Sequence, residues 1–137
     1  MAWTKEEQAA HRAAWCEALE SGEYAQTAGY LRDPDGYCCL GVGCDVYHKI
    51  TGLGHWEIED PKSTFVLWMG AKVTSSVALP DAVMDFFGLA TNEGIYVEEE
   101  PYKYSELTRL NDDLGKSFSE IAAVIRAEPP ELIKEGD

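Results

Sequence analysis

Basic residues are scarce in this chain of 137 residues, which has 11 lysines and arginines against 25 aspartates and glutamates and a formal net charge of −14. Proteins that bind duplex nucleic acid need lysine and arginine side chains to replace the counterions of the phosphates. The shortage therefore argues against direct duplex nucleic-acid binding. The same acidity favours solubility. As an alternative, it suits a surface that imitates nucleic acid and occupies a basic protein.

Long apolar runs and a secretory signal are also lacking. No segment approaches the roughly 20 apolar residues that a membrane-spanning helix needs, and residues 1–7 are polar, unlike the apolar centre of a secretory signal. The four cysteines, two of them adjacent at Cys38 and Cys39, do not have the spacing of a secreted disulfide framework. We therefore expect a cytoplasmic protein with free thiols and no membrane association. The sequence leaves open whether it forms a homo-oligomer.

The length and the ordinary share of hydrophobic residues, 45%, predict one domain over residues 1–137. Capping boxes at Thr4–Glu7 and Ser117–Glu120 mark two helix starts, and the Asp-Pro-Asp-Gly run at 33–36 marks a hairpin turn. Periodicity and breakers predict helices at 4–19, 42–50, 80–88, 105–115 and 117–128, hairpins over 30–39 and 55–68, a strand at 94–97 and a loop at 98–101. The expected fold is an α+β domain with four or five helices around a small antiparallel sheet, ordered from about 4 to 128, with a frayed tail at 129–137.

The most informative stretch is residues 37–47, which holds three of the four cysteines, two glycines and two tyrosines. We interpret it as a strand at 37–40, a glycine turn and the start of a helix. Nearby aromatic residues would pack in the core or wall a pocket for a planar ligand. In the pocket interpretation the glycine N–H groups bind a phosphate, the aspartate accepts a ribose hydroxyl, and a distant asparagine pairs with a base edge. The predicted ligand-binding residues are Tyr37, Gly41, Gly43, Asp45, Trp56 and Asn111. No Gly-Lys-Ser/Thr loop or dinucleotide fingerprint is present.

The thiols allow two further interpretations. Cys39, Cys44 and His48 share a helix face, and with Cys38 or His55 they would form a four-ligand zinc site. However, the chain lacks a C-x-x-C pair, and free cysteines commonly pack as small apolar groups. We therefore predict no metal and no other cofactor, with the zinc site as the alternative.

Cysteine-dependent catalysis is the second interpretation. The stretch from Cys39 resembles the Cys-Ser-Gly start of the active-site helix in papain-like cell-wall peptidases, and a helix N-terminus lowers a thiol pKa. A catalytic thiol needs a base within hydrogen-bond reach. None of His11, His48 and His55 lies far downstream on a strand, where that fold supplies its histidine. A Cys39-dependent hydrolase therefore stays an alternative, and the leading hypothesis is non-enzymatic.

The segment from Leu107 to Ala127 has the outline of a helix-turn-helix. Its polar positions carry more acidic than basic residues, whereas proteins that contact phosphates and bases need a basic surface. An ordinary pair of antiparallel helices is the better prediction.

Four stretches of the chain resemble a family of small tailed-phage and prophage proteins. Residues 17–26 resemble its opening L-x-S-G-x-Y-x-Q, residues 37–45 its central Y/F-C-C-L-G-V-x-C-D, residues 79–83 its L-P helix, and residues 110–122 its closing L-N-D-x-G-x-S-F-x-x-I-A. The chain departs from the family by an extra residue before Gly115. It also has Gly43 where the family more often has alanine or leucine.

The resemblance implies a context and no catalytic residue. Small phage proteins outside the virion often act on the host, frequently against its defences. It therefore implies a phage-encoded anti-defence protein in the host cytosol that sequesters a small nucleotide-like immune signal. The alternative partner is a host defence protein, which an acidic surface would occlude.

Overall fold

The computed structural model describes residues 3–68, 70–99 and 103–134. Within these ranges lie five helices: α1 (Lys5–Glu20), α2 (Cys39–Thr51), α3 (Asp81–Phe87), α4 (Leu107–Asp112) and α5 (Phe118–Ala127). None of them has the length and apolar character that crossing a membrane requires.

The main sheet is built around β4 (Lys62–Trp68), which pairs antiparallel with three strands. These are β3 (His55–Glu59), β1 (Arg32–Asp33) and β5 (Lys72–Ser75), and β1 also pairs with β2 (Gly36–Tyr37). A separate antiparallel hairpin contains β6 (Ile95–Glu99) and β7 (Lys103–Glu106). The α+β prediction, with five helices and antiparallel sheets, is confirmed.

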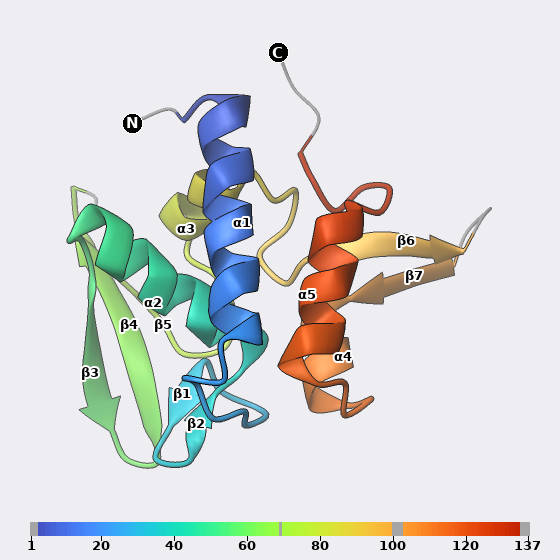
Figure 1. The fold of residues 1–137 in the computed structure, drawn as a ribbon. Coiled ribbons are helices and arrows are strands. Elements are labelled where there is room, and N and C mark those ends of the chain that lie inside the picture. Colours follow the sequence, from blue (N-terminus) through green and yellow to red (C-terminus); the bar gives the residue numbers. More distant parts are fainter. Residues whose placement is uncertain (1–2, 69, 100–102, 135–137) are drawn as a thin grey trace.

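Helix α1 runs through the middle of the molecule and separates its two sides (Figure 1). The main sheet and α2 lie on one side, and α4, α5 and the β6–β7 hairpin lie on the other. Trp15 of α1 is fully buried, and its indole N–H donates to the Cys39 carbonyl of α2 at 3.0 Å. On the opposite side, the Cys16 thiol contacts the Ala122 carbonyl of α5 at 3.6 Å. The core therefore joins both halves through α1.

Both predicted capping boxes are present, at Thr4 with Glu7 and at Ser117 with Glu120. The predicted start of α2 is wrong, because the helix begins at Cys39 rather than Val42. Cys38 is the extended N-cap residue, and its sulfur accepts the Gly41 N–H at 3.4 Å. Residues 39 and 40 therefore belong to the first helical turn and not to a strand.

Three other boundaries differ from the predictions. Residues 98 and 99 extend β6 instead of lying in a loop, and residues 100–101 of that predicted loop lie outside the described ranges. Ser105 lies in β7, so α4 starts two residues later than expected. Strand β5 was not predicted.

The prediction of a frayed tail is wrong for residues 129–134. Leu132 is fully buried, Ile133 forms a β-bridge with Leu89, and the Lys134 N–H donates to the Gly88 carbonyl at 2.8 Å. An apolar side chain beyond the two prolines returns the chain to the core. Residues 135–137 lie outside the described ranges.

Candidate functional site

The cysteines of the central stretch are buried, and none has the surroundings of a nucleophile. The Cys39 thiol is fully enclosed and donates to the Leu107 carbonyl at 3.5 Å. Burial raises the pKa of Cys39 and Cys44 well above the usual thiol value and that of Cys38 to about 11. Because the thiolate is the reactive form, this environment argues against the Cys39 hydrolase alternative.

The alternative zinc site is not formed. Among the described residues, no group of three or more histidine, cysteine, aspartate or glutamate side chains could hold a metal ion. Cys39 and Cys44 are enclosed in the core, whereas His48 is turned to the end of α2, where its Nδ1 lies 3.1 Å from the Leu53 carbonyl. All three residues belong to α2, but Cys39 and His48 are nine positions apart and lie on opposite sides of the helix.

Gly41 and Gly43 are packing positions and not a phosphate loop. A Cβ at Gly41 would lie 1.7 Å from the Leu31 carbonyl oxygen, so α2 touches the backbone of the preceding segment there. A Cβ at Gly43 would lie 3.3 Å from the rings of Trp15 and Phe87. Both glycines face protein at close range, which leaves no space for a phosphate. Their prediction as ligand-binding residues is therefore wrong.

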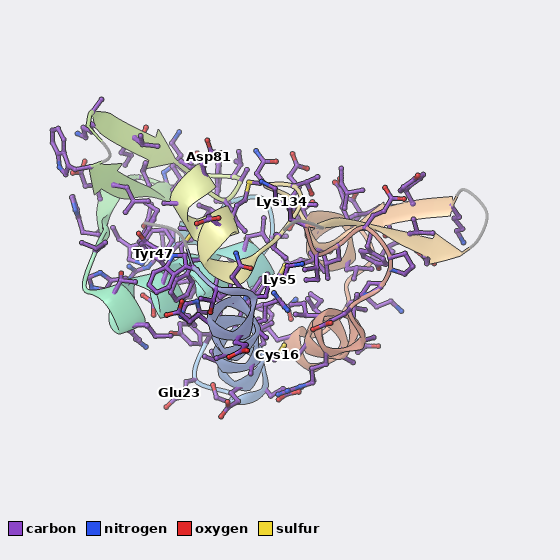
Figure 2. The ribbon with its side chains drawn as sticks, turned by 90° about the horizontal axis from the view of Figure 1, so that it is seen from above. Lys5, Cys16, Glu23, Tyr47, Asp81 and Lys134 are labelled. Atoms are coloured by element: carbon purple, nitrogen blue, oxygen red, sulfur yellow. The ribbon has the colours of Figure 1, made fainter. Side chains whose placement is uncertain are left out.

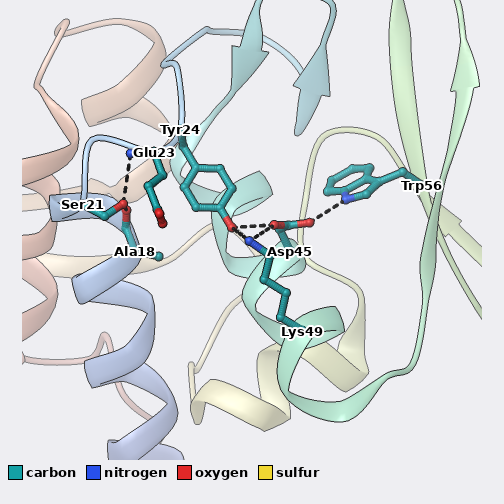
Figure 3. A network of polar contacts seen from close by, with 7 residues as sticks. All are labelled: Ala18, Ser21, Glu23, Tyr24, Asp45, Lys49 and Trp56. Atoms are coloured by element: carbon teal, nitrogen blue, oxygen red, sulfur yellow. Dashed lines mark hydrogen bonds and ion pairs between the residues drawn. The ribbon is translucent and has the colours of Figure 1, made fainter.

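Three of the predicted residues, Tyr37, Asp45 and Trp56, do lie together. Figure 3 shows the hydrogen bond between Asp45 and Trp56. The Trp56 indole N–H donates to Asp45 Oδ1 at 3.3 Å, the Tyr24 hydroxyl donates to Oδ2 at 2.5 Å, and Lys49 Nζ lies 3.2 Å from Oδ2. Burial alone would raise the pKa of Asp45, but the hydrogen bonds from Tyr24, Trp56 and Lys49 outweigh it and lower the pKa. Both carboxylate oxygens are therefore already occupied by protein groups.

Aromatic rings close around this network. Tyr37 packs edge-on against Tyr24 and Trp56, with ring centroids 4.9 and 5.9 Å apart. The Arg32 guanidinium lies 5.2 Å from the Tyr37 ring centroid and 5.5 Å from that of Trp56, within the range of cation–π attraction. The cluster joins α2 to β2 and β3, and its groups bind one another.

Asn111 is a structural residue as well. Its Oδ1 accepts the Cys39 N–H at 3.2 Å and the Gln26 side-chain N–H at 2.9 Å, and its Nδ2 donates to the Thr27 carbonyl at 2.8 Å. The first N–H groups of a helix lack partners within the helix, and Asn111 supplies one for α2. Its predicted role in pairing with a base edge is therefore wrong.

Three of the stretches that resemble the phage family meet in these two clusters. Tyr24 of the opening stretch binds Asp45 of the central stretch. Gln26 of the opening stretch binds Asn111 of the closing stretch, which in turn caps α2 at Cys39. Tyr24, Gln26 and Asn111 of these stretches thus have a structural role, because their hydrogen bonds hold α2 in place.

A groove that could hold a ligand lies elsewhere in the described structure. A groove of about 1050 Å³ runs between the C-terminal end of α2, the end of β4 and α3, with Trp3 at its rim. We call it the α2–α3 groove. Its lining residues are Trp3, Tyr47, Ile50, Thr51, Gly52, Leu53, Gly54, His55, Val66, Leu67, Trp68, Asp81, Ala82 and Asp85.

Apolar side chains that solvent reaches surround the α2–α3 groove. Trp68 is 72% exposed, Leu53 57% and Ile50 48%. Positive φ angles of 75° and 76° at Gly52 and Gly54 turn the chain from α2 into β3, and this turn carries Leu53. Large exposed apolar side chains in one patch are unusual on a protein surface unless something binds there.

Buried rings support the other wall. Phe86 of α3 is fully buried, and both Trp3 and Tyr47 pack edge-on against it, with centroid distances of 5.3 and 5.0 Å. In Figure 2 the labelled Tyr47 lies to the left of α3, and Asp81 lies at the upper end of that helix. The groove thus combines aromatic side chains that pack against the core with two exposed aliphatic side chains, Ile50 and Leu53.

The acidic side chains of the described lining are Asp81 and Asp85, and the lining also holds the imidazole of His55, whose Nε2 lies 2.8 Å from Glu57. Among the described residues, no lysine or arginine lines the groove. This site was not predicted from the sequence. A usable signal was the apolar Ile50, Leu53 and Trp68 at the ends of elements, where polar residues are expected.

The C-terminal helix pair is an ordinary αα unit. Phe118, Ile121 and Ile125 of α5 are buried in the core that α5 shares with α1, and Figure 1 shows the two helices side by side. Arg126 of α5 binds Glu20 of α1 through two N–H groups at 2.7 and 3.2 Å. The apolar side of α5 is therefore packed against α1.

Neither the curated proteins nor the solved structures include a match to this chain. A family model described as a domain of unknown function, DUF8296, matches residues 8–129. The match spans α1 to the end of α5 and includes every residue of the Asp45 and Asn111 clusters. The chain therefore belongs to the DUF8296 family.

Proposed function

We propose that this protein is a non-enzymatic binding protein that holds a small, largely apolar or planar ligand in the α2–α3 groove. The observation that carries the proposal is the groove itself, about 1050 Å³ in volume, beside a 72% exposed Trp68. Ligand sites are commonly concave, mostly apolar and close to this size. The buried, protonated thiols and the saturated Asp45 carboxylate offer no comparable site.

The ligand class follows from the lining. Trp3, Tyr47 and Trp68 offer aromatic surface on which a planar group can stack. Asp81 and Asp85 repel a phosphate, and the lining residues that the structure describes include no lysine or arginine to bind one. The hypothesis of a nucleotide-like immune signal therefore concerns the base or nucleoside portion. The resemblance to small phage proteins supports the anti-defence context of this proposal.

A protein partner is the second candidate, and the net charge of −14 favours it. An acidic surface attracts a basic host protein at long range, and salt screens this attraction. In that case binding to the host protein weakens steeply as the salt concentration rises. Equal binding at low and high salt would exclude this candidate.

Thermal unfolding with a panel of small ligands tests the leading proposal. The panel contains adenosine, its monophosphate, cyclic nucleotides, ADP-ribose and uncharged aromatic compounds. A ligand that binds only the folded state stabilises it by about 2.7 kcal/mol at a concentration of about 100 times Kd. We expect stabilisation by uncharged planar compounds and a smaller effect of each phosphorylated counterpart.

Trp68→Ala and Ile58→Ala provide the matched pair of variants. Both side chains are strongly exposed, at 72% and 81%, but only Trp68 lines the groove. We expect Trp68→Ala to lose the ligand-induced shift and Ile58→Ala to keep it. A panel without any stabilising compound, or a Trp68→Ala protein that responds like the wild type, would contradict the proposal. Native mass spectrometry of protein purified from host cells would then show whether a ligand is retained at all.

A further inference from the structure

Helix α3 carries two carboxylates, and their placement together does not stabilise the helix. Asp81 and Asp85 are four residues apart on this short helix and both line the α2–α3 groove. Like charges at this spacing repel one another. Asp81, in the first turn, suits the positive end of the helix dipole, but Asp85 lies near the negative end, and the last turn holds no basic residue.

Neither carboxylate has a cationic partner in the part of the chain that the structure describes. The main-chain carbonyl of Asp85 accepts a hydrogen bond from Gln8 at 2.8 Å, but its carboxylate is not involved. This contrasts with Asp45, whose two oxygens are both bound by protein donors. Two uncompensated negative charges thus lie at the edge of an aromatic groove.

Aromatic faces and carboxylates together form the surroundings that organic cations prefer. A cation above a tryptophan or tyrosine ring is attracted by the negative face of the ring. Trp3, Tyr47 and Trp68 supply rings in the groove lining, and the nearest basic group of that lining, His55, is engaged with Glu57. A positive charge placed here would also relieve the repulsion between Asp81 and Asp85.

We infer that the α2–α3 groove binds a small organic cation, an ammonium group joined to an apolar or planar body. The inference rests on the proposed function and narrows its ligand class. The aromatic residues contact the apolar body, and Asp81 and Asp85 select for the positive charge. The net charge of −14 acts in the same direction, because it raises the local concentration of cations around the protein.

Two probes of the same shape and different charge test the inference: benzyltrimethylammonium and its uncharged isostere neopentylbenzene. Their binding is followed by NMR through the indole N–H signals, since Trp3 and Trp68 line the groove. We expect the cation to bind at least about threefold more tightly than the isostere, as an exposed cation–π contact plus a surface ion pair allows. Higher salt should reduce this preference.

Asp81→Asn and Asp85→Asn keep the size of each side chain and remove its charge. We expect each variant to lower the cation preference, and the double variant to lower it to the part that the aromatic rings supply, with the affinity for neopentylbenzene unchanged. Asp35→Asn, in the exposed turn between β1 and β2, is the matched control and should behave like the wild type. The indole spectrum of each free variant confirms that it is folded.

The outcomes separate the two proposals. Equal binding of both probes, or a double variant with the same cation preference as the wild type, would overturn the cation inference and leave the binding groove in place. Absence of binding by both probes, together with a silent ligand panel, would overturn the proposed function as well. An apolar peptide with a central lysine that binds more than about tenfold tighter than benzyltrimethylammonium, a difference of about 1.4 kcal/mol, would replace the small cation with a partner protein.

Discussion

Single residues decide how α2 is held, and Asp45 shows this most clearly. Its lowered pKa means that the folded state favours the carboxylate relative to the unfolded chain, where the ordinary value is 3.8. The stabilisation is therefore complete well above that value and is lost as the pH falls through the lower folded-state pKa. The ion pair with Lys49 adds little, because the lysine side chain is 63% exposed.

Asp45→Asn should lower the free energy of unfolding by about 1–3 kcal/mol at neutral pH, because it disrupts hydrogen bonds to a buried charge. The difference from the wild type should shrink as the pH falls from about 6 towards about 3, across the ordinary aspartate pKa. Urea unfolding followed by circular dichroism at both ends of this range measures it. Asp35→Asn is the exposed control. A difference that stays constant with pH would contradict the role of the carboxylate charge.

Gly41 and Gly43 lie on the same helix, but we expect a substitution by alanine to be destabilising at Gly41 and tolerated at Gly43. Gly41→Ala should cost more than about 3 kcal/mol, because the new Cβ would lie 1.7 Å from a backbone oxygen. For Gly43→Ala the nearest atoms are side-chain atoms at 3.3 Å, and the gain in helix propensity is about 1 kcal/mol. Its net effect should stay within about 1 kcal/mol. Equal costs in urea unfolding would show that Gly41 does not approach Leu31 as described.

At the scale of elements, the segment after α5 is part of the core. Leu132→Ala should lower the free energy of unfolding by about 2–5 kcal/mol, since it leaves a cavity where a fully buried leucine was. Lys134→Ala, which keeps the backbone bond to Gly88, is the control. Thermal and urea unfolding of both variants measure the effect. A Leu132→Ala protein as stable as the wild type would restore the prediction of a frayed tail.

Helices were predictable from the sequence because the residues at their ends carry local capping signals. Capping boxes mark α1 and α5, and glycines with positive φ close α2 at Gly52 and α3 at Gly88. Strand β5 has no such signal: three of its four residues are polar, and its only strand partner in the described structure is β4. Short strands depend on distant partners, and the local sequence does not specify them.

The site divides in the same way. The sequence indicated that Tyr37, Asp45 and Trp56 lie together, and they do, but their groups satisfy one another. Asp45 is saturated because it also binds Tyr24, which lies 21 residues away in the chain. The sequence around Asp45 does not indicate this partner. The α2–α3 groove was missed because it forms where the ends of α2 and β4 meet α3 and Trp3. Its residues are neighbours only in the folded chain.

For the whole molecule, the dominant property is the charge of −14, with 25 acidic residues against 11 basic ones. Net repulsion of this kind destabilises the compact state, and salt screens it. The melting temperature should therefore rise between about 0.01 M and about 1 M sodium chloride, over which the Debye length falls from about 30 to about 3 Å. Scanning calorimetry measures it.

A neutral osmolyte at matched osmolality is the control for that measurement, because it changes hydration without screening charge. A melting temperature that falls with salt would mean that the favourable pairs, such as Arg126 with Glu20 and Arg12 with Glu128, outweigh the general repulsion.

The cap that Asn111 places on α2 also has a consequence for how the protein is made. The capped N–H, at Cys39, precedes Asn111 by 72 residues. At a synthesis rate of about 5–20 residues per second, the ribosome needs roughly 4–14 seconds to bridge that interval. During this interval the Cys39 N–H at the start of α2 lacks its hydrogen bond to Asn111. The cap on α2 is thus completed only after most of the chain has been translated.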